Sequence, residues 1–512
     1  MPDESSLGPN GLIKRQEFVR LIIQSLFSLG YNKSASLLES ESGITCKSSQ
    51  LKLLESHIHN FNWDECVKTV MEEINEQQTR NRILFLIYRH RIFEFLRDDD
   101  FESALKVLQK RVSRLGVGVE TEKVHNLACG IITTAELDDG GSGLQGDLLV
   151  ELKRLLPTPI TLPERRLEHL VELAVTAQWD SCIYHNSNEA AISLYEDHCC
   201  SRDQIPNETV QILNNHENEV WFVQFSNNGH YLASSSSDCT AIIWKVPEEG
   251  ILSLKHILRS HQNPVSFVSW SPDDKMLLTC GNEEVLKLWD VETGICMHTF
   301  GDLIPVVSSC AWFPDSKRLV CASSDPKKCI YMWDLQGNEL EAWRGVRMPK
   351  VTDLALTPDG EHLISVCFEK NIRIFNFRTK TERIIKEEHV ITSLSVSRDR
   401  EFFIINLNSQ EIHMHDIAGN WKTPLKYMGH KQGKYVIRSC FGGANNMFIA
   451  SGSEDSQIYI WNRRNCEPVE ILSGHLNNVN CVSWNPKRPH MLASASDDQT
   501  IRIWGPSRRK NL

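Results

Sequence analysis

The sequence predicts an α+β multidomain protein, in which an N-terminal all-α region precedes a C-terminal, seven-bladed all-β propeller. Up to about residue 200, apolar residues recur at helical spacing. Beyond that point, short runs of alternating polarity recur with a period of roughly 40 to 46 residues, as expected for four-stranded propeller blades. With 512 residues, the chain is too long for one ordinary core, so more than one domain is expected.

The composition narrows the class of protein. Hydrophobic residues make up 41% and charged residues 24%, which are globular values. The net charge of −11 argues against nucleic acid as a partner, since phosphate binding needs basic patches. The first ten residues are polar and do not resemble a signal peptide, and the longest strongly apolar run, Ile83–Tyr88, is too short to span a membrane. We therefore expect a soluble protein of the cytoplasm and nucleus, whose 16 scattered cysteines are reduced.

The N-terminal segment predicts a pair of short helices. Residues 1–11 are expected to form a disordered tail, and Gln16–Leu29 carries apolar residues on one helical face. Gly30 is suited to end this helix, and Asn32 to begin a second helix that ends near Gly43. Helices this short bury too little apolar surface to be stable alone, so they need a second copy or the next domain.

Residues 12–43, which contain QEFVRLIIQSLFSLGYNKSASLLESESGI, resemble a LisH motif. The resemblance implies dimerisation through the paired helices. The alternative is a helical hairpin that packs only on its own chain. The residues expected at the dimer interface are Phe18, Ile22, Leu26, Leu29, Tyr31 and Leu38.

Further helices are predicted up to about residue 180. They are expected at Gln50–Asn60, Asp64–Asn75, Arg80–Leu96, Phe101–Val112, Thr121–Ala135, Leu148–Leu156 and Pro163–Asp180, with a Gly-rich loop at Asp138–Asp147. The stretches FNWDECVKTV and FLIYRHRIFEFLRDDDFESALKVLQKRV make residues 48–112 resemble a CTLH domain. Residues 113–200 stand where proteins with that domain have a CRA segment. Glu189–Tyr195, within them, is ambiguous between helix and loop.

The propeller prediction rests on one unit, Gly474–Trp504, and on its repetition. The unit contains runs of alternating polarity at Val479–Trp484, Met491–Ser494 and Thr500–Trp504, which predict half-buried strands. Similar runs end at Trp244, Trp289, Trp333, Phe375, His415 and Trp461, which predicts seven blades within residues 205–505. Val210–Leu213 is placed to supply the outer strand of the final blade. Residues 506–512 are expected to form a basic tail.

Four residue types repeat at fixed positions in three of these units. A His stands near the start, a Ser ten residues before the final Trp, and an Asp six residues before it. These units resemble WD repeats, in which such side chains form a hydrogen-bonded structural tetrad. The expected members are His216, Ser234, Asp238, Trp244, His430, Ser451, Asp455, Trp461, His475, Ser494, Asp498 and Trp504. Hydrolase triads use the same residue types, but the repetition and the lack of a G-x-S-x-G elbow favour a scaffold, so no catalytic residue is predicted.

Metal-binding patterns are weak in this sequence. His198-Cys199-Cys200 is the only cluster that suggests a metal, and it lacks the C-x-x-C pair common in zinc sites. His413 and His415 lie on one side of a predicted strand without a third ligand. We therefore expect neither a metal site nor a cofactor.

The order of the predicted domains is rare. LisH, CTLH and CRA helices ahead of a WD propeller resemble the LisH/CTLH/WD-repeat subunits of the CTLH (GID) E3 ubiquitin ligase complex. The resemblance implies a non-catalytic scaffold that forms homodimers or larger oligomers and joins other LisH/CTLH subunits and RING subunits. Its propeller would bind substrate proteins or adaptors, and neither nucleic acid nor a membrane span is expected.

In WD propellers, residues just before and within the first strand of each blade face one rim. Exposed aromatic residues there are good anchors for a protein partner. Trp221 and Tyr435 are the expected anchors, and the alternative is that either residue packs between blades. By alignment of the repeats, the expected binding face consists of Glu219, Trp221, Lys350, Thr352, Tyr435, Ile437, Glu454 and Asp497.

Two other functions compete with this one. Substrate receptors of cullin-4 ligases carry a W-D-x-R box, but Trp289-Asp290 and Trp333-Asp334 have no Arg at that spacing. Plant transcriptional co-repressors also combine LisH, CTLH and WD repeats, but they are far longer and have two propellers. An enzyme is least favoured, because the sequence has no P-loop, kinase motif set, metal framework or catalytic cysteine context.

Overall fold

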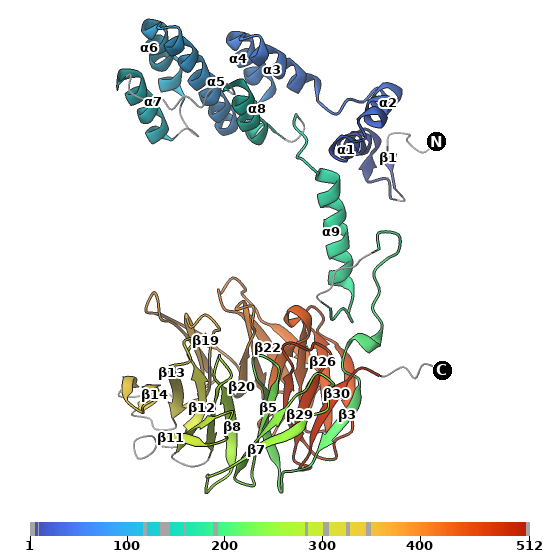
Figure 1. The fold of residues 1–512 in the computed structure, drawn as a ribbon, viewed down its shortest axis with the longest axis vertical. Coiled ribbons are helices and arrows are strands. Elements are labelled where there is room, and N and C mark those ends of the chain that lie inside the picture. Colours follow the sequence, from blue (N-terminus) through green and yellow to red (C-terminus); the bar gives the residue numbers. More distant parts are fainter. Residues whose placement is uncertain are drawn as a thin grey trace. The chain divides into compact units, whose positions relative to one another are not determined.

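Helices make up the first of two compact units in the computed structural model, Met1–Thr176, and β-strands dominate the second, Ala177–Leu512 (Figure 1). The chain therefore has a mainly helical region ahead of a β-propeller, as predicted. The structure describes residues 6–8, 10–115, 120–133, 144–157, 160–187, 193–281, 285–300, 307–323, 328–344 and 350–507.

Two short helices, α1 (Arg15–Ser28) and α2 (Asn32–Ser42), form the expected N-terminal pair. The chain reverses between them at Gly30, whose φ of 88° a residue with a side chain adopts only with strain. Within the two helices only Ile23 and Ala35 are buried. The pair therefore leaves most of its apolar side chains in contact with solvent.

Ahead of α1, the chain forms a small hairpin. The strand β1 (Ser6–Leu7) pairs antiparallel with β2 (Ile13–Lys14). The described part of residues 1–11 is thus ordered by backbone pairing, which corrects the prediction of a disordered tail. Residues 1–5 and 9 lie outside the described residues.

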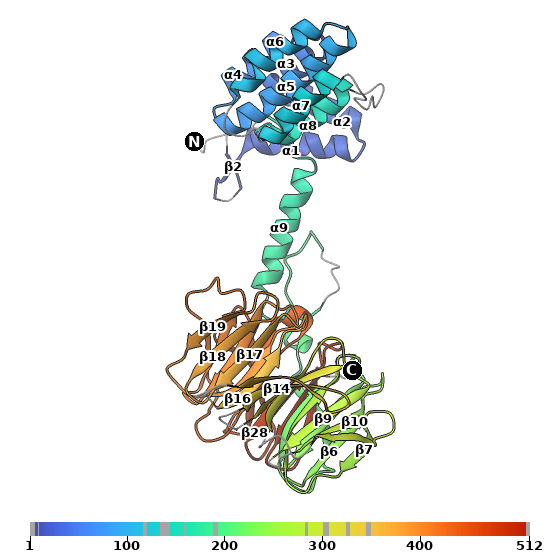
Figure 2. The same cartoon turned by 90° about the vertical axis from the view of Figure 1, so that its left-hand side faces the viewer.

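A helical core follows, organised around α5. The remaining helices are α3 (Ser49–His59), α4 (Trp63–Glu73), α5 (Gln77–Arg97), α6 (Phe101–Lys110), α7 (Thr121–Thr133), α8 (Leu144–Leu155) and α9 (Arg166–Ser181). Helix α5 packs on α4, α6 and α8 (Figure 2). Its run Ile83–Tyr88 is buried throughout, because neighbouring helices cover the helix on several sides. No helix among the described residues is long and apolar enough to cross a membrane.

Two predicted boundaries in this region need correction. Helix α8 begins at Leu144, so the end of the predicted loop Asp138–Asp147 is helical; residues 134–143 lie outside the described part. The ambiguous segment Glu189–Tyr195 also lies largely outside it, and its last three residues are not helical.

Seven four-stranded antiparallel sheets form the propeller, and we number them blades I to VII in chain order. Blade I contains β4 (Val220–Phe225), β5 (Tyr231–Ser236), β6 (Thr240–Lys245) and β7 (Ser253–Arg259); blade II, β8 (Val265–Trp270), β9 (Met276–Gly281), β10 (Leu286–Asp290) and β11 (Cys296–Phe300); blade III, β12 (Val307–Trp312), β13 (Arg318–Ser323), β14 (Lys328–Asp334) and β15 (Glu339–Arg344). Blade IV contains β16 (Val351–Leu356), β17 (His362–Cys367), β18 (Asn371–Asn376) and β19 (Thr381–Lys386); blade V, β20 (Ile391–Val396), β21 (Phe402–Leu407), β22 (Glu411–Asp416) and β23 (Leu425–Met428). Blade VI contains β24 (Ser439–Gly442), β25 (Phe448–Ser451), β26 (Gln457–Asn462) and β27 (Pro468–Ser473); blade VII, β28 (Val479–Trp484), β29 (Leu492–Ser496), β30 (Ile501–Gly505) and β3 (Glu208–Leu213).

A strand from outside the repeats closes the ring. In blade VII, β3 pairs antiparallel with β30, so this blade combines the two ends of the propeller (Figure 1). The register sets Thr209 opposite Trp504 and Leu213 opposite Ile501. The prediction that Val210–Leu213 supplies this outer strand is confirmed. Without it, β30 would expose a row of unpaired N–H and C=O groups.

The first strands of the blades are buried more completely than their alternating pattern predicts. Every residue of β28 is buried, so the prediction of a half-buried strand at Val479–Trp484 was wrong. The physical reason is tertiary, because the neighbouring blades cover both faces of this strand. Polar residues such as Asn480 and Ser483 are buried with the apolar ones, and each makes hydrogen bonds to blade I.

Candidate protein-binding surface of the propeller

All first strands begin at one end of the propeller, and the turns between second and third strands return to it. We call this end the rim. The same backbone hydrogen bond joins the two features in several blades. It runs from Ser237 N–H to Glu219 O at 3.0 Å in blade I, from Phe368 N–H to Lys350 O at 2.9 Å in blade IV, and from Asp497 N–H to Asn478 O at 3.1 Å in blade VII. Residues far apart in sequence thus reach one surface.

An acidic corner lies on the rim where blades VII and I meet. Trp221, half-buried, donates its indole N–H to Glu219 Oε2 at 2.9 Å. Asn480 Nδ2 donates to Asp497 Oδ1 at 2.6 Å and to Val220 O at 3.0 Å, which ties the two blades together. Burial and the nearby charge of Glu219 raise the pKa of Asp497. A cationic side chain of a partner would be stabilised beside these two carboxylates.

The rim of blade VI is a loop held by one carboxylate. Glu454 Oε1 accepts the backbone N–H groups of Gly433, Lys434 and Tyr435 at 3.0, 2.8 and 2.8 Å. Burial opposes the ionised form, but these hydrogen bonds prevail and lower the pKa of Glu454. Glu454 therefore acts as an anchor for the loop, which holds the Tyr435 ring 41% exposed. The Lys434 ammonium lies 5.0 Å from the centre of that ring.

Ile437 is not available to a partner. It is fully buried, as are Val220 and Val351, which precede Trp221 and Thr352 in the first strands of blades I and IV. The strand register nevertheless agrees with the predicted alignment, because Ser439 pairs with Ser451 in blade VI as Val223 pairs with Ser234 in blade I, and Ile437 and Trp221 each stand two residues earlier. At this position the side chain is buried in blade VI and half-buried in blades I and IV, so the prediction of an accessible residue was wrong for Ile437 alone. The next residue, Arg438, corresponds to Phe222 and Asp353.

The remaining predicted residues differ in their access to solvent. Lys350 is exposed, while Thr352 is half-buried and donates its hydroxyl to Val366 O at 3.2 Å. The sequence analysis missed three apolar residues on the rim: Phe368, Val436 and Leu476, which are 62%, 54% and 82% exposed. Leu476 directly follows the His475 of its tetrad, and Phe368 is the first residue of the turn between the second and third strands of blade IV. Apolar residues at these two repeat positions are the signal that could have revealed them.

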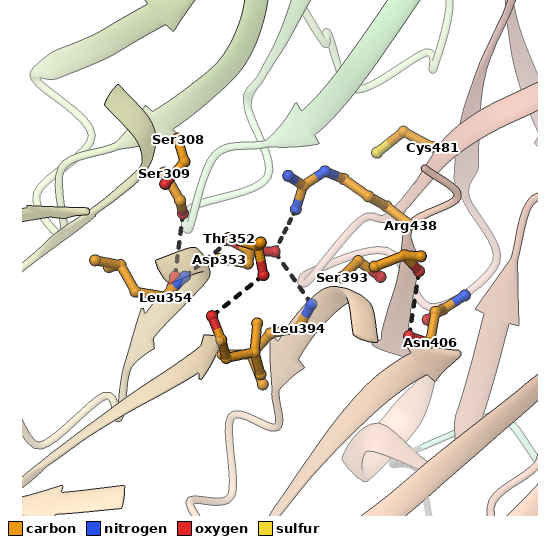
Figure 3. A network of polar contacts seen from close by, with 12 residues as sticks. Ser308, Ser309, Thr352, Asp353, Leu354, Ser393, Leu394, Asn406, Arg438 and Cys481 are labelled. Carbon is orange, nitrogen blue, oxygen red and sulfur yellow. Dashed lines mark hydrogen bonds and ion pairs between the residues drawn. The ribbon is translucent and has the colours of Figure 1, made fainter. Parts of the chain in front are cut away.

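Below the rim, polar contacts cross the central channel between blades IV, V and VI (Figure 3). Arg438 Nη1 lies 2.7 Å from the buried carboxylate of Asp353, which also accepts the backbone N–H of Leu394 at 3.1 Å. The Arg438 guanidinium lies 5.1 Å and 5.0 Å from the ring centres of Phe222 and Phe267, in blades I and II. Arg438 therefore connects the channel walls of four blades, and Asp353 extends the contacts to blade V.

The expected tetrad is complete in blades I and VII. His216 Nδ1 lies 2.8 Å from Asp238 Oδ2 and its Nε2 2.8 Å from Ser234 Oγ, which accepts the Trp244 indole N–H at 3.1 Å. The corresponding distances in blade VII are 2.8, 2.7 and 2.8 Å, in the set His475, Asp498, Ser494 and Trp504. In blade II, Thr279 Oγ1 lies 2.7 Å from His261 Nε2 and accepts the Trp289 N–H at 2.8 Å.

Blade VI departs from the expected tetrad, although the sequence places His430, Ser451, Asp455 and Trp461 correctly for it. Asp455 accepts the Tyr459 hydroxyl at 3.0 Å, and Trp461 donates to Met428 O at 3.1 Å. His430 Nε2 lies 3.4 Å from Gln432 Oε1. Burial lowers the pKa of His430 to about 4, so the ring is neutral. Tyr459 thus bonds the Asp455 carboxylate, and Gln432 lies beside the His430 ring, each in place of the tetrad partner that the sequence predicted.

Comparison with known proteins covers both units. A model of the WDR26 Lis-homology domain matches residues 4–48, and a model of the WD domain, G-beta repeat, matches 207–245, 252–290, 294–334, 343–376, 421–462 and 466–505. A WD repeat-containing protein WDS homolog of Arabidopsis thaliana is 60% identical over 98% of this chain and 97% of its own length. A WD repeat-containing protein 26 homolog of the same plant is 44% identical over 99% of this chain and 87% of its own length. GID complex subunit 7 of Schizosaccharomyces pombe is 34% identical over 95% of this chain and 96% of its own length.

This chain belongs to the WD repeat-containing protein 26 family. The WD-domain matches leave residues 377–420 uncovered, yet most of blade V lies there in this family member. In that blade His415 takes the position of the final tryptophan. His415 Nε2 lies 2.9 Å from Glu387 Oε1, and His413 lies 3.0 Å from Glu387 Oε2 and 2.8 Å from Glu411 Oε2. The two histidines that the sequence placed on one side of a strand thus form an ion-pair network.

Charge holds this network together. Burial favours the neutral ring of His413, but hydrogen bonds to Glu387 and Glu411 outweigh it and raise the pKa of His413. Burial likewise opposes ionisation of Glu387, yet the His413 and His415 rings lower the pKa of Glu387 to about 2. Lys426, 3.3 Å from Glu411, completes the charged groups around His413. At the repeat position where blades I and VII have the neutral indole of a tryptophan, blade V therefore has a histidine that takes part in ion pairs.

We predict that Asp498→Ala lowers the free energy of unfolding of the propeller by about 1–3 kcal/mol, because it leaves the buried His475 without its acceptor. Asp455→Ala, at the same repeat position in blade VI, should cost less, because Asp455 does not bond His430. Urea unfolding followed by tryptophan fluorescence measures both. If the two variants lost the same free energy of unfolding, the proposed difference between the tetrads of blades VII and VI would be wrong.

A second prediction concerns pH. Since the pKa of His413 is raised in the folded state, its contribution to stability is complete below its unfolded pKa of about 6.5 and is lost as pH rises through the folded value. Replacement His413→Gln should therefore destabilise the propeller more near pH ~6 than near pH ~9, by about 1.4 kcal/mol for each pH unit between the two pKa values. Unfolding curves at both pH values measure the difference.

Glu387, with a pKa of about 2, stays ionised across this range. The control is His389→Gln, which changes an exposed histidine just ahead of β20 and should show no such dependence. A destabilisation by His413→Gln that grows as the pH rises would contradict the sign of this prediction.

Proposed function

We propose that this chain is a non-catalytic scaffold and recruiting subunit of a GID (CTLH) E3 ubiquitin ligase complex of the cytoplasm and nucleus. The observation that carries the proposal is the similarity to GID complex subunit 7, which extends through both the helical unit and the propeller. The helical unit would assemble the complex, and the rim of the propeller would bind substrates or adaptors. Ubiquitin transfer would belong to RING subunits.

The LisH helices support self-association. Leu29, Tyr31 and Leu37 are 65%, 61% and 60% exposed, so the hairpin of α1 and α2 displays large apolar side chains. The other expected interface residues, Phe18, Ile22, Leu26 and Leu38, are half-buried. A second LisH hairpin, from another copy or from a related subunit, would cover this surface, and a symmetric pair would double the binding sites of the assembly.

The helices that follow offer a second surface for assembly. Their core is continuous across α3 to α8 and includes the buried Ile58, Trp63 and Ile87. Outside it, Leu53, Met71 and Phe101 are 51%, 51% and 43% exposed. Other CTLH-bearing subunits are the partners proposed for these helices, on the strength of the resemblance of residues 48–112 to that domain.

The rim has the chemistry of a protein-binding surface. Aromatic and aliphatic anchors stand beside charged groups: Tyr435 next to Lys434, and Trp221 next to Glu219 and Asp497. Such anchors, when rigidly held, carry most of the energy of an interface. Trp221 is held by its hydrogen bond to Glu219, and the Tyr435 backbone by Glu454. A partner with apolar residues next to a lysine or arginine would complement both features.

Catalysis by this chain is not part of the proposal. The Ser, His and Asp residues of the complete tetrads serve as scaffolding, and Ser234 and Ser494 are fully buried. A substrate carbonyl cannot reach these hydroxyls, each of which already bonds a histidine and an indole.

Affinity purification of the tagged full-length chain, followed by mass spectrometry, tests the proposed function. RING and CTLH-bearing subunits should co-purify, and so should a second copy of this chain that carries a different tag. Recovery of cullin-4 and its adaptors, or of DNA-bound repressors, without any CTLH-bearing protein would contradict the proposal.

The proposed rim has its own test. The double substitution Trp221→Ala and Tyr435→Ala should lower the recovery of substrates or adaptors at least about tenfold, since loss of two anchors costs more than 1.4 kcal/mol. Recovery of RING and CTLH subunits should not change. The matched control is Trp421→Ala, which removes an aromatic residue 40% exposed in the turn between the third and fourth strands of blade V, away from the rim. Unchanged substrate recovery in the folded double variant would exclude this surface.

A further inference from the structure

Four metal-binding side chains meet where α9 ends and the chain turns toward β3. Cys182 follows the last residue of α9, and its N–H donates to Gln178 O and Trp179 O at 3.1 Å. His185 stands three residues later. The chain then returns and brings His198 and Cys200 beside them. The four residues have the order C-x₂-H followed by H-x-C.

The distances between the donor atoms suit one small cation. His198 Nε2 lies 3.0 Å from His185 Nδ1 and 3.2 Å from Cys200 Sγ, and Cys200 Sγ lies 3.6 Å from His185 Nδ1. The donor atoms of Cys182, His198 and Cys200 all lie within 4.8 Å of one another, while His185 is close to His198 and Cys200 but lies outside this group of three. In tetrahedral zinc sites, with Zn–S near 2.3 Å and Zn–N near 2.0–2.1 Å, neighbouring donor atoms are about 3.3–3.8 Å apart.

The surrounding groups hold these side chains in place without help from the metal. Gln178 Oε1 accepts the backbone N–H of His198 at 3.1 Å, and Gln178 Nε2 donates to Asp197 Oδ1 at 2.9 Å. The Trp179 ring stacks on His185, with centroids 5.4 Å apart and planes at 16°. Cys200 N–H points at Cys182 Sγ, 3.4 Å away. Backbone N–H groups directed at ligand sulfur, and contacts that fix imidazole rings, are the supporting interactions that metal sites use.

The neighbouring residue Asn186 secures the same segment to the propeller. Its side chain is fully buried, donates to Gln204 O at 2.8 Å and to Pro489 O at 2.7 Å, and accepts the Ala444 N–H at 2.8 Å. The segment that carries Cys182 and His185 is thus attached to blades VI and VII.

We propose that Cys182, His185, His198 and Cys200 bind one structural Zn²⁺ ion that fastens the end of α9 to the segment entering β3. Two imidazoles and two thiolates favour zinc among the common divalent ions, and four protein ligands leave no open position for catalysis. On binding, the two thiols release their protons to solvent. No metal was expected here from the sequence, because His198-Cys199-Cys200 lacks a C-x-x-C pair and Cys182 and His185 lie well before it in the chain.

The second group of potential ligands, Glu387, His413 and His415, does not carry the same inference. There each imidazole already lies within hydrogen-bond distance of a carboxylate, and no thiol is present. At Cys182 and Cys200, by contrast, the thiols are free. The donor set contains no carboxylate that could pair with its two imidazoles.

Metal analysis of the purified full-length chain tests the proposal. The reduced protein should contain about one zinc per chain, measured by plasma mass spectrometry and by release to a chromogenic chelator. Cys200→Ser and Cys182→Ser should each lose most of this zinc. Cys199→Ser, which changes the exposed cysteine next to the proposed ligand, should retain it.

Two results would overturn the proposal: a native chain without zinc whose Cys182 and Cys200 form a disulfide, or equal loss of zinc in Cys199→Ser and Cys200→Ser. Should the serine variants fail to fold, cobalt(II) exchange into the native chain still decides. Thiolate-to-cobalt charge transfer with strong visible absorption indicates the tetrahedral site, and its absence contradicts it.

Discussion

Closure of the ring by β3 is the constraint on which the rest of the propeller depends. Blade VII is built from β28, β29 and β30 at the end of the chain and from a strand that precedes blade I. The rim residues come from different blades, so they share one surface only while this pairing holds. The chain ahead of β3 is fixed as well, because Asn186 bonds the backbone of blades VI and VII and Arg202 pairs with Glu470 of β27. The complete tetrads lie in blades I and VII, the two blades on either side of this seam.

Away from the seam, the blades use other means of support. Blade V replaces the tetrad by ion pairs around Glu387, and blade VI by a tyrosine–aspartate contact. Across the channel, Arg438 joins Asp353 and lies over two phenylalanine rings. A buried ion pair of this kind costs desolvation energy, so its main contribution is to fix the relative positions of the blades. The polar links thus differ from blade to blade, while buried apolar residues form the core of every blade.

This arrangement separates the proposed tasks of the protein. The helical unit displays exposed apolar side chains, which we propose bind related subunits, while the propeller holds a rim with exposed aromatic residues and an acidic corner. Residues at the rim contribute little to the core, which allows them to vary with the partner. The proposed zinc site lies where α9 joins the propeller unit. A metal there would strengthen the attachment of the segment that leads into β3, the strand that closes the ring.

The sequence by itself determined the order of the domains, the seven repeats, the closing strand and the positions of the tetrads in blades I and VII. Each of these depends on periodicity and local spacing, which a single chain displays directly. Only the tertiary structure decided that β28 is buried on both faces, that Ile437 points inward while Arg438 reaches the channel, and that blade VI forms no tetrad. It alone brought Cys182 and His185 to His198 and Cys200. Contacts between blades, and between segments separated by a loop, depend on register and packing in space, and a period-2 pattern specifies neither.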